Sequence, residues 1–114
     1  MSLIAPGRVL VIADFPNQEN PCLGTRRWII VLEDLDEKII AIPCTTKTHQ
    51  SIRYKKYIEV EKSSYYGREM QIDYDSLIIC DRTAAIRKLG LRIIDYKGIC
   101  PDELLDEIEA MLRP

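Results

Sequence analysis

The sequence predicts a mainly β domain: a small, strongly bent barrel or sandwich of short antiparallel strands, closed by a C-terminal helix. Six short runs are rich in Val, Ile and Tyr, the residues that favour strands. Turn residues separate these runs, and only the C-terminal segment has helical spacing. Many short strands must protect their edges, and curling the sheet achieves this. The whole chain, residues 1–114, is expected to form a single domain.

The predicted strands cover residues 8–15, 28–34, 38–44, 57–60, 76–80 and 91–96. Residues 34–37, three of which are acidic, lie between the second and third strands and predict a tight hairpin, so these strands are expected to pair in antiparallel fashion. Residues 15–27 contain two prolines, two asparagines and a glycine, which predicts a long loop. Loops of that length are uncommon unless they serve a site. Residues 61–70 are expected to form a second polar connection.

The predicted helix lies in residues 98–112. Pro101 suits its first helical position, and Asp102 and Glu103 suit the positive end of the helix dipole. A single face collects apolar residues at helical spacing, which are Leu104, Leu105, Ile108, Met111 and Leu112. We expect this stripe to pack on the sheet.

The composition is that of an ordinary folded domain, with 46% hydrophobic and 30% charged residues. The net charge of -2 gives no general attraction to nucleic acid, so a polyanion would need a local basic patch. The longest apolar runs are about five residues, whereas a membrane helix needs roughly 20. The N-terminus lacks the pattern of a secretory signal. We therefore expect a cytoplasmic protein without membrane contact.

The four cysteines, Cys22, Cys44, Cys80 and Cys100, form no C-x-x-C pair, and the chain has one histidine. This spacing does not match a zinc site, so we expect no metal and no cofactor. Cys44 and Cys80 lie in apolar runs and are expected to be reduced core residues.

Residues 39–50, IIAIPCTTKTHQ, form an apolar run that breaks at Pro43 and presents Thr45 and Thr46. The two hydroxyls either face a phosphate or begin a turn through local backbone bonds. The segment that follows is basic and contains two tyrosines: Lys47, His49, Arg53, Tyr54, Lys55, Lys56 and Tyr57. It could follow an RNA backbone while its rings stack on bases, or be a solvated hairpin with its tyrosines packed inward.

The segments GRVLVIADFP, GTRRWIIV, AIPCTTK, IICDRTAAI and YKGICPDELLDEIEAML occur in an order that resembles the MazF/PemK family of toxin endoribonucleases. The resemblance extends from Gly7 to Leu112. It implies an SH3-like barrel with a C-terminal helix and a homodimer. It also implies metal-independent cleavage of single-stranded RNA, with a 2′,3′-cyclic phosphate product, and inhibition by a cognate antitoxin.

The resemblance also implies site residues. Arg26 keeps the family's G-x-R register, although Arg27 replaces the following proline, so either arginine could grip the phosphate with its planar fork. Thr45, beside Thr46, would donate a hydrogen bond to the scissile phosphate.

Asp81 would take a proton or orient the arginine. Alternatively, Asp81 has no catalytic role and is a surface or strand-end residue that pairs with Arg82 or Arg87. His49 is a second candidate for the catalytic base. Alternatively, its side chain contacts only solvent or a phosphate.

Two other functions remain open at this stage. A protein of the same fold could inhibit a protein target through its terminal helix, as the CcdB gyrase poisons do. Alternatively, the chain could be a binding module without catalytic activity, because Ile79 stands where some relatives have a second arginine.

Overall fold

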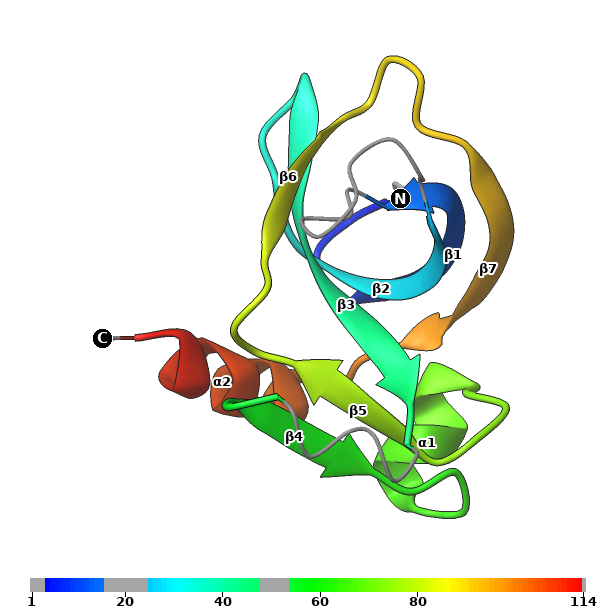
Figure 1. Ribbon diagram of the computed structural model, residues 1–114, viewed down its shortest axis with the longest axis vertical. Helices are drawn as coiled ribbons and strands as arrows, with labels where there is room; N and C mark the ends of the chain where they lie inside the picture. The colour runs from blue at the N-terminus through cyan, green and yellow to red at the C-terminus, as the bar shows by residue number, and fades with distance from the viewer. Residues whose placement is uncertain (1–3, 16–24, 48–53, 114) are drawn as a thin grey trace.

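The strands follow the segments rich in β-branched residues, and both helices described here lie in the second half of the chain (Figure 1). The computed structural model describes residues 4–15, 25–47 and 54–113. The elements of this described part are β1 Arg8–Phe15, β2 Thr25–Asp34, β3 Lys38–Thr46, β4 Tyr57–Val60, α1 Tyr65–Met70, β5 Ser76–Ile79, β6 Ala84–Arg87, β7 Ile93–Ile99 and α2 Asp102–Leu112.

The strands form one antiparallel sheet in the order β4-β5-β3-β2-β1-β7, and β6 also pairs with β3. The sheet curls strongly, with β7 swinging round the same end of the molecule as β6 (Figure 1). The prediction of a mainly β fold with a C-terminal helix is confirmed. The predicted closure of the barrel is not confirmed, because no strand pairing in the described residues joins β7 to β6 or to β4.

Strand β3 is the centre of the sheet because it has three partners. It pairs with β2 on one side, and on the other side it pairs first with β6, over residues 38–41, and then with β5, over residues 44–46. Pro43 lies in the gap between these two partners, where a residue without an N–H is tolerated. The strand therefore continues to Thr46, two residues beyond the predicted end.

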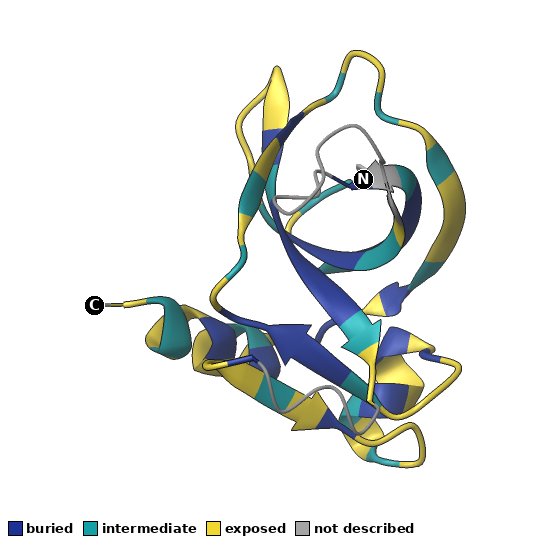
Figure 2. Ribbon diagram, viewed as in Figure 1, coloured by how far each residue is buried: buried dark blue, intermediate teal, exposed yellow. Residues whose placement is uncertain are grey.

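Two hydrophobic clusters use opposite faces of the same strands. Figure 2 shows that β3 is buried along most of its length. Ile30 and Ile42 belong to one cluster, whereas their neighbours Ile29 and Ala41 belong to the other, as the alternation of side chains along a strand requires. Helix α2 covers the first cluster. The second cluster lies inside the curl of β1, β2 and β3 and includes Ile86 of β6.

Helix α2 confirms the predicted C-terminal helix. Leu104 and Ile108 are fully buried, and the other residues of the predicted apolar stripe pack against the same cluster. Burying each of these two side chains stabilises the fold by about 1.5 to 3 kcal/mol. Pro101 is the N-cap residue rather than the first helical residue. Neither helix in residues 4–15, 25–47 and 54–113 has the length and apolar character that crossing a bilayer requires.

Helix α1 and strand β6 were not predicted. The Ser64 side chain caps α1 by accepting a hydrogen bond from the Gly67 N–H at 3.1 Å. Gly67 also allows a close approach, since a Cβ atom there would lie 2.1 Å from the Glu61 carbonyl oxygen. The segment predicted as a polar connection therefore contains a short helix. Its six residues are too few to show a clear apolar periodicity.

The predicted hairpin at residues 34–37 is confirmed. The Leu35 N–H donates to the Lys38 carbonyl at 2.9 Å, and Asp36 has φ 66°. Strand β6 continues into this end, because Lys88 donates its N–H to the Glu37 carbonyl and pairs with the Asp34 carboxylate at 2.5 Å. Lys88 holds the pKa of Asp34 below its ordinary value.

Cys44, Cys80 and Cys100 are buried and unpaired, which confirms the core positions predicted for Cys44 and Cys80. Burial raises the pKa of Cys80 to about 11 and that of Cys100 to about 12. These thiols stay protonated near neutral pH. Cys22 lies outside the described residues.

Candidate active site

The candidate site lies where β3 ends beside β2 and β5. The last paired residues of β2 and β3 are Trp28 and Cys44. Continuing this register by one residue sets Arg27 across from Thr45, and by two residues Arg26 across from Thr46. Since side chains alternate along a strand, Arg27 and Thr45 share one face of the sheet, and Arg26 and Thr46 share the other.

The polar groups at this end are open to a ligand. Thr45 is half-buried and Thr46 is exposed, while Arg27 is half-buried and Arg26 is exposed. Within residues 4–15, 25–47 and 54–113, neither hydroxyl makes a side-chain hydrogen bond and neither guanidinium makes an ion pair. Local backbone bonds to the threonine hydroxyls, the alternative raised from the sequence, are absent among these residues.

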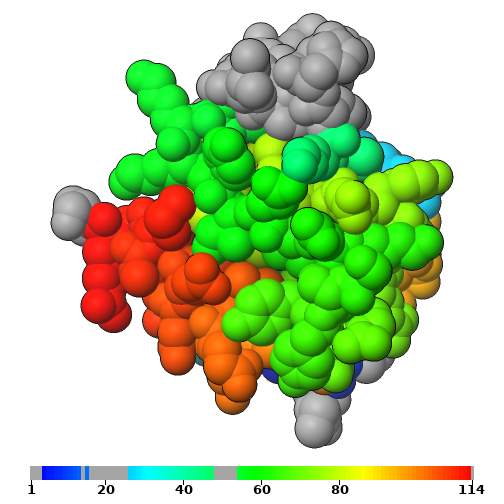
Figure 3. Space-filling view, turned by 90° about the horizontal axis from the view of Figure 1, so that it is seen from below, coloured from blue at the N-terminus to red at the C-terminus, as the bar shows by residue number. Residues whose placement is uncertain are grey.

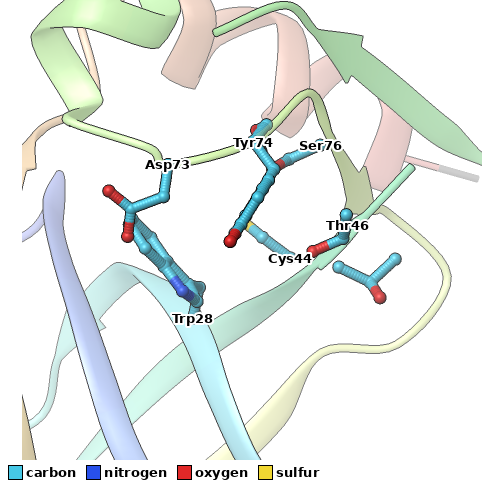
Figure 4. Close-up of a pocket in the computed structure, with 7 residues that line it drawn as sticks. Trp28, Cys44, Thr46, Asp73, Tyr74 and Ser76 are labelled. Atoms are coloured by element: carbon cyan, nitrogen blue, oxygen red, sulfur yellow. Dashed lines mark hydrogen bonds between the residues drawn. The ribbon is translucent and has the colours of Figure 1, made fainter. Parts of the chain in front are cut away.

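A small cavity of about 20 Å³ opens beside the two threonines (Figure 4). Space of this size holds about one water molecule. The sheet and the connection between α1 and β5 line it together, with Trp28, Cys44, Thr45, Thr46, Asp73, Tyr74 and Ser76. Burial raises the pKa of the Cys44 thiol far above its ordinary value. This thiol is therefore protonated and is not a nucleophile.

Sequence reasoning missed three of the cavity's residues: Asp73, Tyr74 and Ser76. They reach the site because β5 pairs with β3 in a register that sets Ser76 against Thr46. The Lys47 N–H fixes the same connection by donating to the Asp75 carbonyl at 2.8 Å. The available signal was the polar run DYDS directly before the apolar strand LIIC. Without the strand register, the sequence could not show that this run lies beside the end of β3.

Asp81 is not brought to this centre. Strand β5 begins at Ser76, beside Thr46, and runs away from it, and Asp81 follows the far end of the strand. The direction of β5 therefore separates Asp81 from the threonines of the same chain, and the role of Asp81 in moving a proton stays a prediction.

The basic segment is only partly described. Lys47, Lys55 and Lys56 are exposed; Lys47 forms an ion pair with Glu59, which raises the pKa of the lysine. Lys56 Nζ lies 3.5 Å from the Met111 carbonyl oxygen, so residues 54–60 (green) border the end of α2 (red) in Figure 3. His49 and Arg53 lie outside the described residues.

The two tyrosines of this segment differ. Tyr57 is 40% exposed, so its ring is accessible to a base. Tyr54 is buried in a small cluster with Leu77 and Ile79, and the Arg82 guanidinium lies 5.4 Å from the centre of its ring. Base stacking by Tyr54 is therefore a wrong prediction, because the core occupies its ring. Inward packing, the alternative, holds for this residue.

In the part of the chain described here, no three His, Cys, Asp or Glu side chains gather closely enough to hold a metal ion. The functional groups that line the cavity at the end of β3 are hydroxyls, an indole, a phenol, a thiol and one carboxylate. The guanidinium groups of Arg26 and Arg27 lie beyond the last residue of β2 that pairs with β3, Trp28. This set can bind an anion and a planar ring.

The fold defines the class of protein. Among solved structures, the chain is similar to MazF (Form-I) from Deinococcus radiodurans, with a TM-score of 0.64 and 18% identity over 95% of this chain and 91% of that chain. It is also similar to MazE-MazF (Form-II) from Deinococcus radiodurans, with a TM-score of 0.63 and 18% identity over 98% of this chain and 94% of that chain. The architecture, a curled antiparallel sheet with a C-terminal helix, is therefore the MazF fold.

The chain belongs to the family of PemK-like, MazF-like toxins of type II toxin-antitoxin systems, whose family model matches residues 8–114. This result confirms the resemblance identified from the sequence. A search of curated proteins finds no match.

Proposed function

We propose that this toxin is an endoribonuclease that cleaves single-stranded RNA in the cytoplasm without a metal ion. The 2′-OH attacks the adjacent phosphate and leaves a 2′,3′-cyclic phosphate. Such a reaction needs groups that offset the charge developing on the phosphoryl oxygens. Membership of the MazF-like toxin family supports the proposal.

One observation carries the proposal: the Arg27 guanidinium and the Thr45 hydroxyl, neither paired with a described residue, each lie one residue beyond the last pair of β2 and β3, Trp28 and Cys44. Arg27 and Thr45 share a face and can contact the same phosphate. Arg26 and Thr46 offer the same groups on the opposite face. The β3 register therefore favours Arg27 as the partner of Thr45, whereas the family pattern favours Arg26.

The basic segment offers a path for the rest of the RNA. Lys55, Lys56 and Tyr57 are exposed and adjacent in sequence, so they can contact the backbone and one base. Lys47 follows Thr46 directly, although its ion pair with Glu59 reduces the positive charge it offers. His49 and Arg53 belong to the same proposed strip.

We also propose that the toxin is a homodimer neutralised by a cognate antitoxin. One solved structure with this fold is a MazE-MazF structure, which supports an antitoxin partner. Strand β7 at the edge of the sheet carries the exposed apolar residues Ile94, Tyr96 and Ile99. Sheet edges and exposed apolar side chains are common features of protein interfaces.

The function is tested by an RNA cleavage assay in the presence of EDTA. We expect the wild-type protein to produce fragments with 2′,3′-cyclic phosphate ends. Thr45→Ala should lower the cleavage rate by about 100 to 1,000-fold, as the loss of one charge-stabilising donor does. Unchanged cleavage by Thr45→Ala would overturn the assignment of the site. A wild-type protein that binds RNA without cutting it would favour the non-catalytic binding module.

A further inference from the structure

Beside the threonines, the Lys97 ammonium group contacts both the Trp28 indole ring and the Asp73 carboxylate. Lys97 Nζ lies 4.8 Å from the centre of the Trp28 ring and 3.6 Å from Asp73 Oδ2. The lysine side chain is only 19% exposed, whereas that of Asp73 is 60% exposed. The carboxylate is therefore fixed on one side and open to solvent on the other.

Asp73 is not needed to neutralise Lys97. A second carboxylate, Asp95 Oδ2, lies closer to the ammonium group, at 3.3 Å. One acid is enough to balance one lysine, so the second and more exposed acid adds a negative charge at the mouth of the cavity. Asp73 lines this cavity, and Asp95 does not.

Tyr74 supplies a flat surface at the same place. Its side chain is 67% exposed, and its ring extends over the cavity between Trp28 and Thr46 (Figure 4). Stacking of one base on an aromatic ring stabilises binding by about 1 to 3 kcal/mol. The Tyr74 ring is available for stacking because it does not pack in the hydrophobic core. Both threonines line the cavity, so a nucleotide whose phosphate lies at the end of β3, in contact with Thr46, would bring an adjacent base within reach of Tyr74.

We propose that Tyr74 and Asp73 form a nucleobase subsite that selects a base with an exocyclic amino group. The base stacks on the Tyr74 ring, and the free carboxylate oxygen of Asp73 accepts a hydrogen bond from the amino group. An ionised carboxylate only accepts hydrogen bonds, so it favours the amino group of cytosine, adenine or guanine over the O4 carbonyl oxygen of uracil. This inference rests on the proposed RNA substrate and adds a base preference to it.

Cytosine and uracil make the sharpest pair of probes because position 4 of the ring bears an amino group in cytosine and a carbonyl oxygen in uracil. The test uses fluorescein-labelled 2′-O-methyl hexanucleotides of cytidine or uridine, which carry no free 2′-OH to attack the phosphate. Binding is measured by fluorescence anisotropy. Trp28, the only tryptophan in the chain, reports occupancy of the cavity by its own fluorescence.

We expect the wild-type protein to bind the cytidine hexamer about tenfold more tightly than the uridine hexamer, within the range that one base-edge contact provides. Asp73→Asn should reduce this ratio to about twofold or less, because its amide can also donate to uracil. Asp95→Asn is the matched control. It removes the other acid on Lys97 and should leave the ratio unchanged.

Tyr74 is tested separately. Tyr74→Leu should weaken binding of both hexamers by about fivefold or more, because it removes the stacking surface, while Tyr74→Phe should bind like the wild type. Affinity retained by Tyr74→Leu would overturn the stacking role. A structural effect is excluded by equal urea midpoints for these variants.

The outcomes separate this inference from the nuclease assignment. Equal affinity of the wild type for both hexamers, or an equal loss of the ratio in Asp95→Asn, overturns the base subsite even if the protein cleaves RNA. A wild type that discriminates between the hexamers but cleaves no RNA overturns the nuclease and supports the subsite. Binding of neither hexamer overturns the base subsite, and the cleavage assay in EDTA decides the nuclease separately.

Discussion

The two ends of strand β3 contain similar numbers of polar residues but use them differently. At the Lys38 end, the polar groups pair with one another: Asp34 with Lys88, and the backbone of Glu37 with that of Lys88. At the Thr46 end, Thr45, Arg26 and Arg27 have no side-chain partner in the part of the chain that is described. The first arrangement closes a hairpin, and the second leaves donors available for a ligand.

Both ends of β3 depend on the packing of its middle residues. A substitution there is therefore expected to cause the largest loss of folding stability. Ile42 is fully buried between them, and Ile42→Ala should destabilise the fold by about 2 to 5 kcal/mol through lost burial and a cavity. Urea denaturation followed by circular dichroism measures this loss. Leu35→Ala, at an exposed position of the hairpin, is the control and should change stability by less than about 0.5 kcal/mol. Equal losses in the two variants would contradict the assignment of Ile42 to the core.

The next effect distinguishes the two arginines of the Thr46 end. Arg27→Ala should lower the RNA cleavage rate by about 100 to 1,000-fold without changing the urea midpoint, because its guanidinium shares a face with Thr45. Arg26→Ala should have a smaller effect on the rate. If Arg26→Ala shows the larger loss, the active phosphate lies on the face of Thr46 instead.

A third effect concerns the buried thiols of the cluster that α2 covers. The folded-state pKa values of Cys80 and Cys100, about 11 and about 12, exceed the ordinary value of 9. The unfolded chain therefore loses these protons first, and stability that is present below pH 9 decreases as the pH rises toward 12. Urea midpoints across this range measure the decrease. Replacing both cysteines by alanine should make it shallower, and an unchanged pH dependence would contradict the explanation.

The smallest effect is expected at the hairpin end. Lys88→Ala removes the partner of Asp34 and should lower the urea midpoint slightly at pH 7, since exposed ion pairs contribute little. The lowered pKa of Asp34 means that this contribution is present above its unfolded value and disappears as the pH falls through the folded value. RNA cleavage should not change. A cleavage rate that falls with Lys88→Ala would show that the two ends are coupled.

Local sequence patterns predicted most of the strands. Strands β1 and β4 begin and end at the predicted residues, since runs of β-branched residues bounded by turn residues are local signals. Helix α1 and strand β6 were missed because six and four residues are too few to establish a period. The extension of β3 from Cys44 to Thr46 was missed because it depends on the pairing with β5, which a local pattern does not show.

The candidate site was predicted in part. Thr45, Arg26 and Arg27 were proposed because hydroxyl and guanidinium groups suit a phosphate, and the family pattern indicated Thr45 and Arg26. Asp73 and Tyr74 could not be found in this way, because only the pairing of Ser76 with Thr46 brings their connection to the cavity. For the same reason, the sequence could not show that the direction of β5 carries Asp81 away from Thr45. Long-range register, not residue type, decides which groups meet.

The change of partner along β3 has a consequence for how the molecule opens. A deuterium atom can replace an amide proton of Ala41 or Cys44 only after β3 has separated from the neighbouring strand that accepts its hydrogen bond, which is β2 on one side and β6 or β5 on the other. Fraying at either rim of the sheet, at β4 or β7, does not release these protons. Strand β3 is therefore expected to hold the slowest-exchanging amides of the described chain, and their rates report the unfolding of the whole domain.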